Sequence, residues 1–345
     1  MRILTLIFLL SFYLNGFAQY APAAGEEGST AIYKDSSIII GWATNCIVKR
    51  GYINIEDTSQ TYTQGEITSN KAFFGNDTLA LGKANGIMDV VSLGDGGNAI
   101  VTFNKPIKNG NDADFVIFEN GFQVQSPPNQ YFLELAFVEV SSDGINFVRF
   151  PAVSLTQTNT QLGGFDQLDP TKIHNLAGKY IANYGTPFDL EDIKDSANIN
   201  IDSVLYVKII DVVGNINPQY ASYDSESNII NDPWSTPFWS CGFDLDAVGV
   251  IHYKDFDNIN TINNENCISI YPNPINNGNN FKIKFKEKNT AIKKINIYNL
   301  TGKLVYSKTT NKNIININSS KFDKQLYILQ IKFKNSIITK KIIIQ

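Results

Sequence analysis

The chain has 345 residues, of which 43% are hydrophobic and 12% aromatic, and this apolar content excludes a disordered protein because it can form a sizeable core. The formal net charge of −4 hides an acidic body and a basic tail. Residues 268–345 carry 15 basic and two acidic side chains, whereas residues 1–267 carry 14 basic and 31 acidic ones; the acidic body argues against nucleic acid as a partner and leaves carboxylates available for calcium.

The first eighteen residues predict a signal peptide. Arg2 gives a positive start, residues 4–12 form an apolar stretch too short to remain as a membrane helix, and Gly16 and Ala18 suit cleavage before Gln19. Beyond them, no apolar segment reaches the roughly 18 residues of a membrane helix. We therefore expect export through the Sec pathway and no transmembrane segment in the mature chain.

Residues 19–255 predict one long β domain. Ile, Val, Phe and Tyr recur in short runs bounded by Gly, Asn, Asp and Pro, which is typical of strands and turns. Residues 142–144 predict the turn of a hairpin, and residues 187–195 are the one candidate helix. Many strands with few helices favour a jelly-roll-like β-sandwich over a parallel α/β fold. The predicted strands are 36–42, 98–104, 114–119, 132–141, 146–150, 204–211 and 243–253.

The Asn-rich segment 256–267 is expected to be a linker to a second domain at 268–345. Residues 281–286 alternate apolar and basic side chains, a pattern that buries one face of a strand and exposes lysine on the other. We expect a small immunoglobulin-like β-sandwich there.

Four motifs in order characterise this C-terminal domain: YPNP at 271–274, IYNLTGKLV at 297–305, LYILQI at 326–331 and KKIIIQ at 340–345. With them, residues 268–345 resemble a type A C-terminal sorting domain of the type IX secretion system. One departure is Gln325, where such domains usually have glycine. The resemblance implies recognition by the type IX machinery, removal by its sortase-like peptidase, and a protein that is secreted or held on the outer cell surface. The alternative is a generic accessory domain that binds a ligand itself.

The acidic body also resembles a family, over residues 36–252. Its members are uncharacterised secreted proteins found in Bacteroidetes and other environmental bacteria, so the resemblance implies a fold and a location but no activity. The matching stretches are GWATNCIVKRGY (41–52), VSLGDGGNAIVTF (91–103), DFVIFENGF (114–122), FVEVSSDGINFVRFP (137–151), NLAGKY (175–180), GTPFDL (185–190) and GFDLDAVGVI (242–251).

Two groups of acids are candidates for binding calcium, which takes oxygen ligands. The first is a loop that is not an EF-hand, with Asp224, Glu226, Asn228 and Asp232; its alternative is a solvated loop. The second consists of acids at strand ends, in which two aspartates spaced two apart are expected on one strand face. It comprises Glu119, Asp244 and Asp246, with Asp89 and Asp211 nearby, and its alternative is hydrogen-bonded support of turns.

A Pro-rich loop carries Trp234, Phe238 and Trp239, and such rings can stack on the C–H face of a sugar. Tyr223, with Tyr184 and Tyr220, could extend this platform. The alternative is that the rings cap the sandwich core. In an oxidising compartment Cys46 and Cys241 could form a disulfide, or both could be buried thiols.

Catalysis has little support in the sequence. The chain has two histidines, His174 and His252, and lacks a nucleophile elbow, a phosphate loop and a dinucleotide fingerprint. We therefore interpret the body as a calcium-stabilised module that binds a glycan or another extracellular ligand. The alternatives are a polysaccharide-acting hydrolase or lyase, whose paired acids are defined by separation in space, and a purely structural surface protein.

Overall fold

The computed structural model describes residues 20–123, 129–254, 268–285, 293–333 and 337–345. The chain divides after Lys254 into two compact units. The predicted signal peptide and linker lie outside the described residues. Within the described ranges, no helix is long and apolar enough to cross a membrane.

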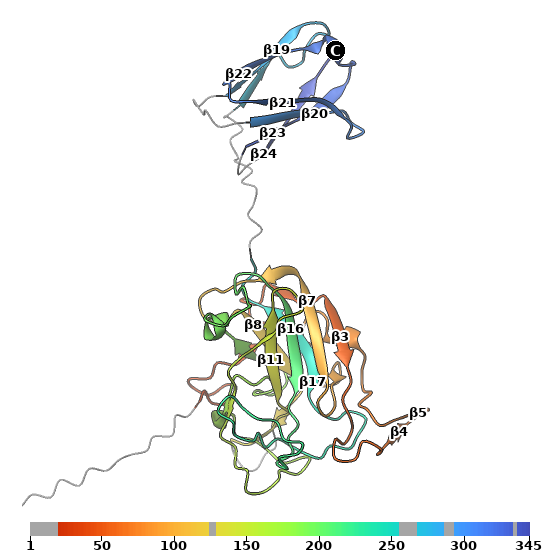
Figure 1. The fold of residues 1–345 in the computed structure, drawn as a ribbon, viewed down its shortest axis with the longest axis vertical. Helices are drawn as coiled ribbons and strands as arrows, with labels where there is room; N and C mark the ends of the chain where they lie inside the picture. The colour runs from red at the N-terminus through yellow and green to blue at the C-terminus, as the bar shows by residue number, and fades with distance from the viewer. Residues whose placement is uncertain (1–19, 124–128, 255–267, 286–292, 334–336) are drawn as a thin grey trace, which may run out of the picture. The chain divides into compact units, whose positions relative to one another are not determined.

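Two antiparallel sheets form the N-terminal unit. In Figure 1, β11, β16, β7 and β3 lie in front of β8 and β17. The first sheet has the order β1 (Ile32–Tyr33), β15 (Tyr184–Phe188), β8 (Phe115–Glu119), β17 (Asp244–Val250) and β2 (Gly41–Trp42), with β6 (Val91–Ser92) also on β17. The second has the order β12 (Val148–Arg149), β11 (Ala136–Ser141), β16 (Val204–Asp211), β7 (Asn98–Ile107) and β3 (Asn45–Lys49).

Short elements complete this unit at its margins. They are β4 (Tyr62–Gln64), β5 (Ile67–Ser69), β9 (Phe122–Gln123), β10 (Tyr131–Phe132), β13 (Val153–Ser154), β14 (Ile173–His174) and the 3₁₀ turns η1 (Asp77–Ala80), η2 (Pro170–Lys172) and η3 (Leu190–Ile193).

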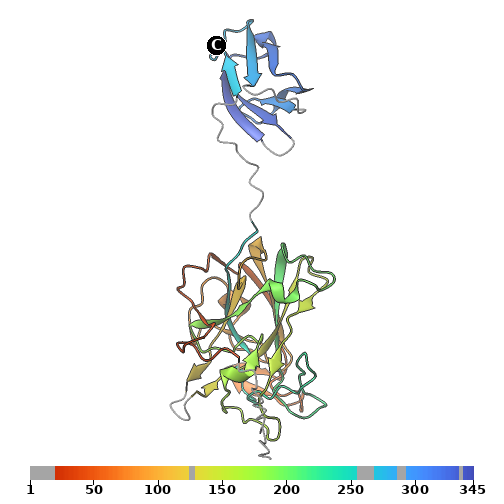
Figure 2. The ribbon, with the colours of Figure 1, turned by 90° about the vertical axis from the view of Figure 1, so that its left-hand side faces the viewer.

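The two sheets share one hydrophobic core. Val101 and Val207 enter it from the second sheet, and Ile117 and Val248 enter it from the first. Figure 2 shows the strands of this unit after a quarter turn. The predicted all-β sandwich is confirmed, because side chains from two antiparallel sheets fill the space between them.

A register shift in β17 lies between Leu245 and Ala247. Leu245 belongs to the central core, whereas Ala247 packs in a separate cluster and Val248 returns to the central core. Such a shift inserts one residue and reverses the alternation of side chains along the strand. Asp244 and Asp246 consequently have different environments, although the sequence predicted one strand face for both.

The hairpin predicted at residues 142–144 is confirmed, because β11 and β12 pair directly across it. The candidate helix at 187–195 is wrong over its first part. Pro187 belongs to β15, where it pairs with Val116, and only the 3₁₀ turn η3 follows. Proline has no N–H to donate, which is tolerated at this position of the ladder.

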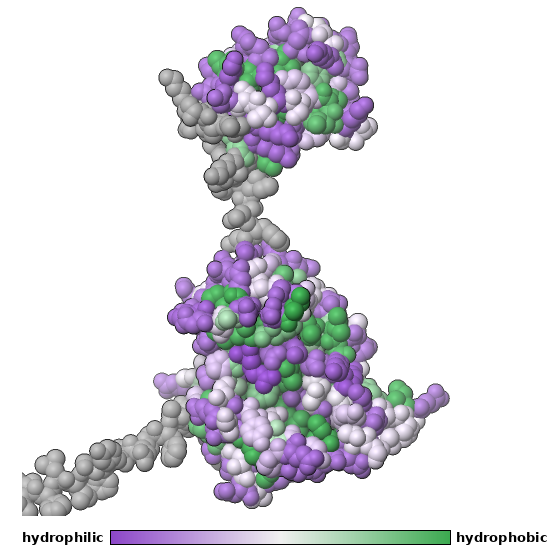
Figure 3. Space-filling model, in the orientation of Figure 1, coloured by the Kyte–Doolittle hydropathy of each residue, from purple (hydrophilic) through white to green (hydrophobic). Residues whose placement is uncertain are grey.

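The C-terminal unit is a smaller sandwich with its own core, which includes Phe281, Ile297 and Leu329. Along β19, Phe281 and Ile283 are buried while Lys282 and Lys284 are exposed, as the alternation predicted. Figure 3 shows hydrophilic residues over much of the visible face of this unit. Its sheets are β18 (Ile268–Tyr271), β19 (Asn280–Phe285) and β22 (Ile314–Asn318), and β21 (Leu304–Thr310), β20 (Lys293–Tyr298), β23 (Leu326–Lys332) and β24 (Ile337–Ile343), with the 3₁₀ turn η4 (Ser319–Lys321).

Candidate functional site

A group of six buried carboxyl groups occupies the N-terminal unit, and we call it the carboxyl cluster. Each of its members is at most 6% exposed. Burial raises the pKa of every one of them, and the charges of other members raise the pKa values of Glu119, Glu134, Asp211 and Asp232 further. The members are Asp95, Glu119, Glu134, Asp211, Asp232 and Asp244.

Two members of the cluster support the fold through backbone hydrogen bonds. Asp211, at the end of β16, accepts from the backbone N–H groups of Phe243 at 2.7 Å and Gly96 at 3.0 Å. Asp95 accepts from the N–H of Ile55 at 2.9 Å. Bonds of this kind offset part of the cost of burying a carboxyl group.

Glu119 and Asp232 are only half satisfied. Oε2 of Glu119 accepts from the N–H of Gly121 at 2.7 Å, and Oδ2 of Asp232 accepts from the N–H of Leu135 at 2.9 Å. Among the described residues, Oε1 of Glu119 and Oδ1 of Asp232 are buried without a hydrogen-bond partner. A buried polar atom left in this way is costly, which points to a proton or a ligand at these oxygens.

Asp244 and Glu134 lie where the cluster meets the surface. Asp244 accepts hydrogen bonds from the Ser92 hydroxyl and, at 3.0 Å, from Nδ2 of Asn120, and burial raises its pKa to about 7. The pKa of Glu134 is raised well above its usual range by burial and then by the charges of Asp244 and Glu119. Glu134 therefore keeps its proton well above the pH at which a free glutamate loses it.

Aromatic rings form a continuous row beside the cluster, and we call it the aromatic row. Phe122 stacks on Phe132 with 4.8 Å between ring centroids, and Phe132 lies 6.0 Å from Phe165. Phe165 in turn lies 5.8 Å from Phe238, which lies 6.3 Å from Tyr62. Phe165 is 67% exposed and Phe122 43% exposed, whereas Phe132 is buried, so the row faces solvent mainly through Phe165 and Phe122.

The row and the cluster meet in a cavity of about 290 Å³. Glu134 and Asp244 reach this cavity from the cluster. Its aromatic lining consists of Phe122, Phe132, Phe165, Phe238 and Trp239. Rings beside carboxyl groups in a hollow make an amphipathic site, in which apolar faces and hydrogen-bonding groups are available to one ligand.

The structure separates the four aromatic residues that the sequence grouped as a ligand platform. Phe238 and Trp239 line the cavity, and Trp239 also packs edge-on against Phe74 with 4.7 Å between centroids. Trp234 instead donates from Nε1 to Asp95 at 3.1 Å, which anchors it to the carboxyl cluster. Tyr223 is exposed and lines a different cavity.

The predicted calcium loop is held together by its own first residue. Oδ1 of Asp224 accepts from the N–H groups of Glu226 at 2.9 Å and Asn228 at 2.8 Å, and Oδ2 accepts from the N–H of Ser154 at 3.1 Å. Asp232 belongs to the carboxyl cluster instead. Within the described ranges, no group of three or more His, Cys, Asp or Glu side chains is arranged to hold a metal ion.

The strand-end acids are divided in the same way. Glu119, Asp211 and Asp244 belong to the carboxyl cluster, but Asp246 accepts from the N–H groups of Asn85 at 3.0 Å and Gly86 at 3.2 Å. Asp89 is hydrogen-bonded to the side chain of Asn85. The shift in β17 thus places Asp246 against a loop, where its carboxylate supports backbone turns.

Of the two alternatives for Cys46 and Cys241, the structure has the second, because both residues are buried free thiols. Cys46 packs in the central core, whereas Cys241 packs with Ile53 and Ala72 in a separate cluster. Burial raises the pKa of Cys46 to about 12. Both thiols therefore behave as small apolar side chains.

Comparison with known proteins identifies the C-terminal unit. Residues 269–345 match the family model of the secretion system C-terminal sorting domain. Among curated proteins, none matches the chain.

The similar solved structures resemble the chain only distantly. PorZ, described as an essential bacterial surface component of the type-IX secretion system of Porphyromonas gingivalis, is 11% identical over 29% of this chain and 14% of its own, with a TM-score of 0.21. The β-glucuronidases of Lactobacillus rhamnosus and Faecalibacterium prausnitzii are 10% and 11% identical over 72% of this chain, with TM-scores of 0.18 and 0.20. The chain spans only 36% and 37% of those two enzymes, so their activity does not transfer to it.

The matched domain defines the class: this is an exported protein with an all-β body and a C-terminal sorting domain. The sorting domain is the one read by the type IX secretion system, and it directs the chain to the cell surface or the extracellular space.

Proposed function

We propose that residues 20–254 form an extracellular glycan-binding module, with the sugar bound along the aromatic row and in its cavity. The observation that carries this proposal is the row itself, because its exposed rings, Phe122 and Phe165, line the cavity and offer apolar faces for sugar rings. Exposed aromatic side chains that line a cavity on an exported protein are typical of an interaction site. Glu134 and Asp244 supply hydrogen bonds to hydroxyl groups at its inner side.

A binding assay on the full mature chain tests this function. We expect insoluble polysaccharides or immobilised glycans to retain the wild-type protein, and Phe165→Ala and Trp239→Ala to weaken binding at least about tenfold, as loss of a central anchor does. Tyr223→Ala is the matched control, because Tyr223 is similarly exposed but lines a different cavity. Equal binding by all four proteins would exclude the aromatic row as the site.

Calcium remains part of the proposal, and its best support is the pair of unpartnered oxygens, Oε1 of Glu119 and Oδ1 of Asp232. A hard cation takes such oxygens as ligands and would draw the carboxyl groups of the cluster closer together. We expect calcium to raise the melting temperature of the chain and a chelator to lower it. An identical melt in both conditions removes calcium from the function.

A polysaccharide-acting enzyme is the second candidate, and the pair Glu134 and Asp244 favours it. Both carboxyl groups lie in one cavity with raised pKa values, and a protonated carboxyl group beside an ionisable one is the equipment of glycoside hydrolysis. Release of new sugar ends by the wild type but not by Glu134→Gln would establish catalysis. If the protein neither binds polysaccharide nor releases sugar ends from it, the purely structural role is the one that remains.

We also propose that a sortase-like peptidase removes the sorting domain after transport. The separate core of residues 268–345 supports this, because the domain is a complete folded module. Mass spectrometry of the surface protein should find no peptide from residues 269–345, whereas the precursor inside the cell contains them. Tail peptides in the surface protein would contradict removal.

A further inference from the structure

A second and larger cavity, of about 1000 Å³, lies in the N-terminal unit, at the end of strands β8 and β17 that is opposite to the carboxyl cluster. In the antiparallel pair of β8 and β17, Glu119 lies opposite Leu245 and Phe115 lies opposite Val250. The carboxyl cluster is thus at one end of the pair, and Asp114 and His252 follow at the opposite end. Both histidines of the chain, His174 and His252, line this second cavity.

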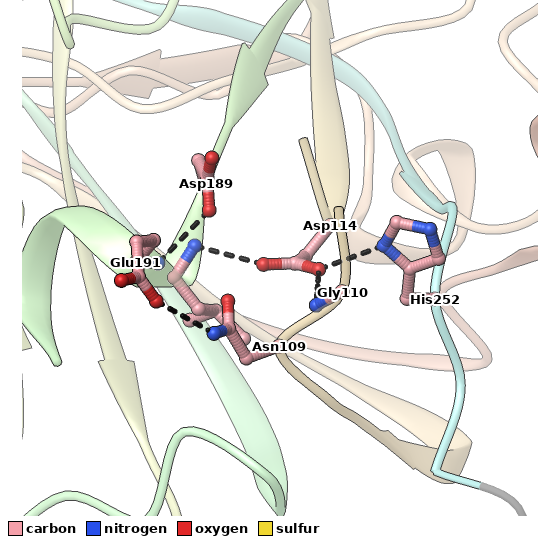
Figure 4. Close-up of polar contacts among 7 residues, drawn as sticks. Asn109, Gly110, Asp114, Asp189, Glu191 and His252 are labelled. Carbon is pink, nitrogen blue, oxygen red and sulfur yellow. Dashed lines mark hydrogen bonds and ion pairs between the residues drawn. The ribbon is translucent and has the colours of Figure 1, made fainter. Parts of the chain in front are cut away.

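His252 is held in a fixed position by Asp114 (Figure 4). Oδ1 of the fully buried Asp114 lies 2.8 Å from Nδ1 of His252 and also accepts from the N–H of Gly110 at 2.7 Å. Its Oδ2 accepts from the N–H of Leu190 at 2.8 Å. A carboxylate accepts, so Nδ1 carries the proton and the imidazole keeps Nε2 for a ligand.

Two other polar side chains that line the second cavity also have unused hydrogen-bonding capacity. Oγ1 of Thr186 is buried and, among the described residues, without a hydrogen-bond partner. Lys179 is 5% exposed and donates from Nζ to the carbonyl of Ile173 at 2.8 Å, which leaves two of its three N–H groups for other acceptors. Tyr20 stacks on His174 with 4.7 Å between centroids and 7° between planes, and the pair forms a flat wall.

The charges of the lining restrict the ligand. Asp112 and Asp192 are exposed at the edge of the cavity, and Asp189 adds a third carboxyl group, so polyanions are repelled. Lys179, buried in the wall, disfavours a cation next to its own ammonium group. The lining thus offers hydrogen-bond donors and acceptors and a flat pair of rings, and it has no net positive charge. These properties suit a ligand that is neutral and rich in hydroxyl groups.

We propose that this cavity is a second binding site, for a short segment of uncharged glycan that hydrogen-bonds to His252, Thr186 and Lys179. The choice of ligand class rests on the proposed glycan-binding function, but the site itself is independent of the aromatic row. A long glycan bound at one end of the sandwich and a second segment bound at the other would be held more tightly than either segment alone.

The two histidines make the cavity measurable by itself. In the full mature chain without a histidine tag, the imidazole NMR signals report on this cavity only. We expect both signals to shift when soluble neutral oligosaccharides are added. Thr186→Val keeps the shape of the side chain but removes its hydroxyl group, so it should lower the affinity measured in this titration several-fold. Trp239→Ala, in the other cavity, should leave the titration unchanged.

Three outcomes would overturn the second site: no shift of either imidazole signal with neutral oligosaccharides, shifts with oligouronates only, or an unchanged affinity in Thr186→Val. The test of the proposed function at the aromatic row has a different outcome from the test of the second site. If Phe165→Ala and Trp239→Ala bind glycan like the wild type while the imidazole signals still shift, the aromatic row is excluded and the second site stands.

Discussion

Asp114 and His252 are 138 residues apart in the sequence and are joined by a hydrogen bond of 2.8 Å between Oδ1 and Nδ1. Asp114 also accepts from the backbone of Gly110 and Leu190. One buried carboxyl group therefore connects the start of β8, the end of β17 and the turn after β15. Three contacts of this kind make Asp114 a structural centre for the second cavity.

Gly110→Ala should disturb this connection. A Cβ at residue 110 would lie 2.2 Å from Nδ1 of His252, so the ring must move from Asp114. We expect a loss of about 1–3 kcal/mol in the free energy of unfolding, as overpacking generally costs. Urea unfolding followed by tryptophan fluorescence measures it, because all three tryptophans lie in the N-terminal unit. Gly163→Ala is the control, since its Cβ would meet nothing closer than 3.4 Å; equal stability of the two variants would contradict the packing.

Reductant should leave the melting temperature of the chain unchanged. Cys46 and Cys241 are free and at most 5% exposed, so no disulfide between them contributes to stability. The third cysteine of the chain, Cys267, is replaced by serine for this test. In that Cys267→Ser background, an alkylating reagent should label neither Cys46 nor Cys241 in the native protein and both after denaturation. Failure to label the denatured, unreduced chain would mean that the two cysteines are paired after all.

In the absence of calcium, the N-terminal unit should lose stability as the pH rises from about 4 to about 7. Burial raises the pKa of Asp244 to about 7 and that of Asp246 to about 6, above the value of about 3.9 in an unfolded chain. The folded state then binds more protons than the unfolded state. This contribution is fully present below pH ~4 and is lost as the pH passes the folded pKa values, with a slope of up to about 1.4 kcal/mol per pH unit for each group.

Urea unfolding at pH 5 and pH 8, followed by tryptophan fluorescence, tests this dependence. Asp244→Asn should flatten it, whereas Glu226→Gln, which changes an exposed acid, should not. A wild-type stability that rises over this pH range in the presence of a chelator would show that Asp244 and Asp246 are not protonated in the folded protein.

Deletion of residues 269–345 should stop export at the periplasm. The sorting domain is the part of the chain that the type IX system reads, and the predicted signal peptide would take the chain only as far as the periplasm. Cell fractionation should place the truncated protein inside the outer membrane, with the fluorescence and melting behaviour of the N-terminal unit retained. Truncated protein on the cell surface would mean that another part of the chain is recognised.

The strands were the most predictable part of this structure. Val204–Asp211 and Asn98–Ile107 form where short runs rich in β-branched residues stand between turn residues. Motif order also identified the sorting domain. The register shift in β17 could not be predicted, because nothing in the alternation of Asp244, Leu245 and Asp246 shows an inserted residue.

The site was only partly predictable for a similar reason. Glu134 stands between Leu133 and Leu135, a pattern typical of a strand with one face in solvent, but the structure buries all three. Phe122, Phe132 and Phe165 come from separate segments, and only the fold aligns them with Phe238. Local sequence shows which rings and acids exist, whereas pairing between distant strands determines which of them meet.

The two hydrophobic cores have no residue in common. A cut between Lys254 and Ile268 would therefore leave each hydrophobic core complete. If the proposed removal of the sorting domain takes place, both products should keep their own folds after they separate.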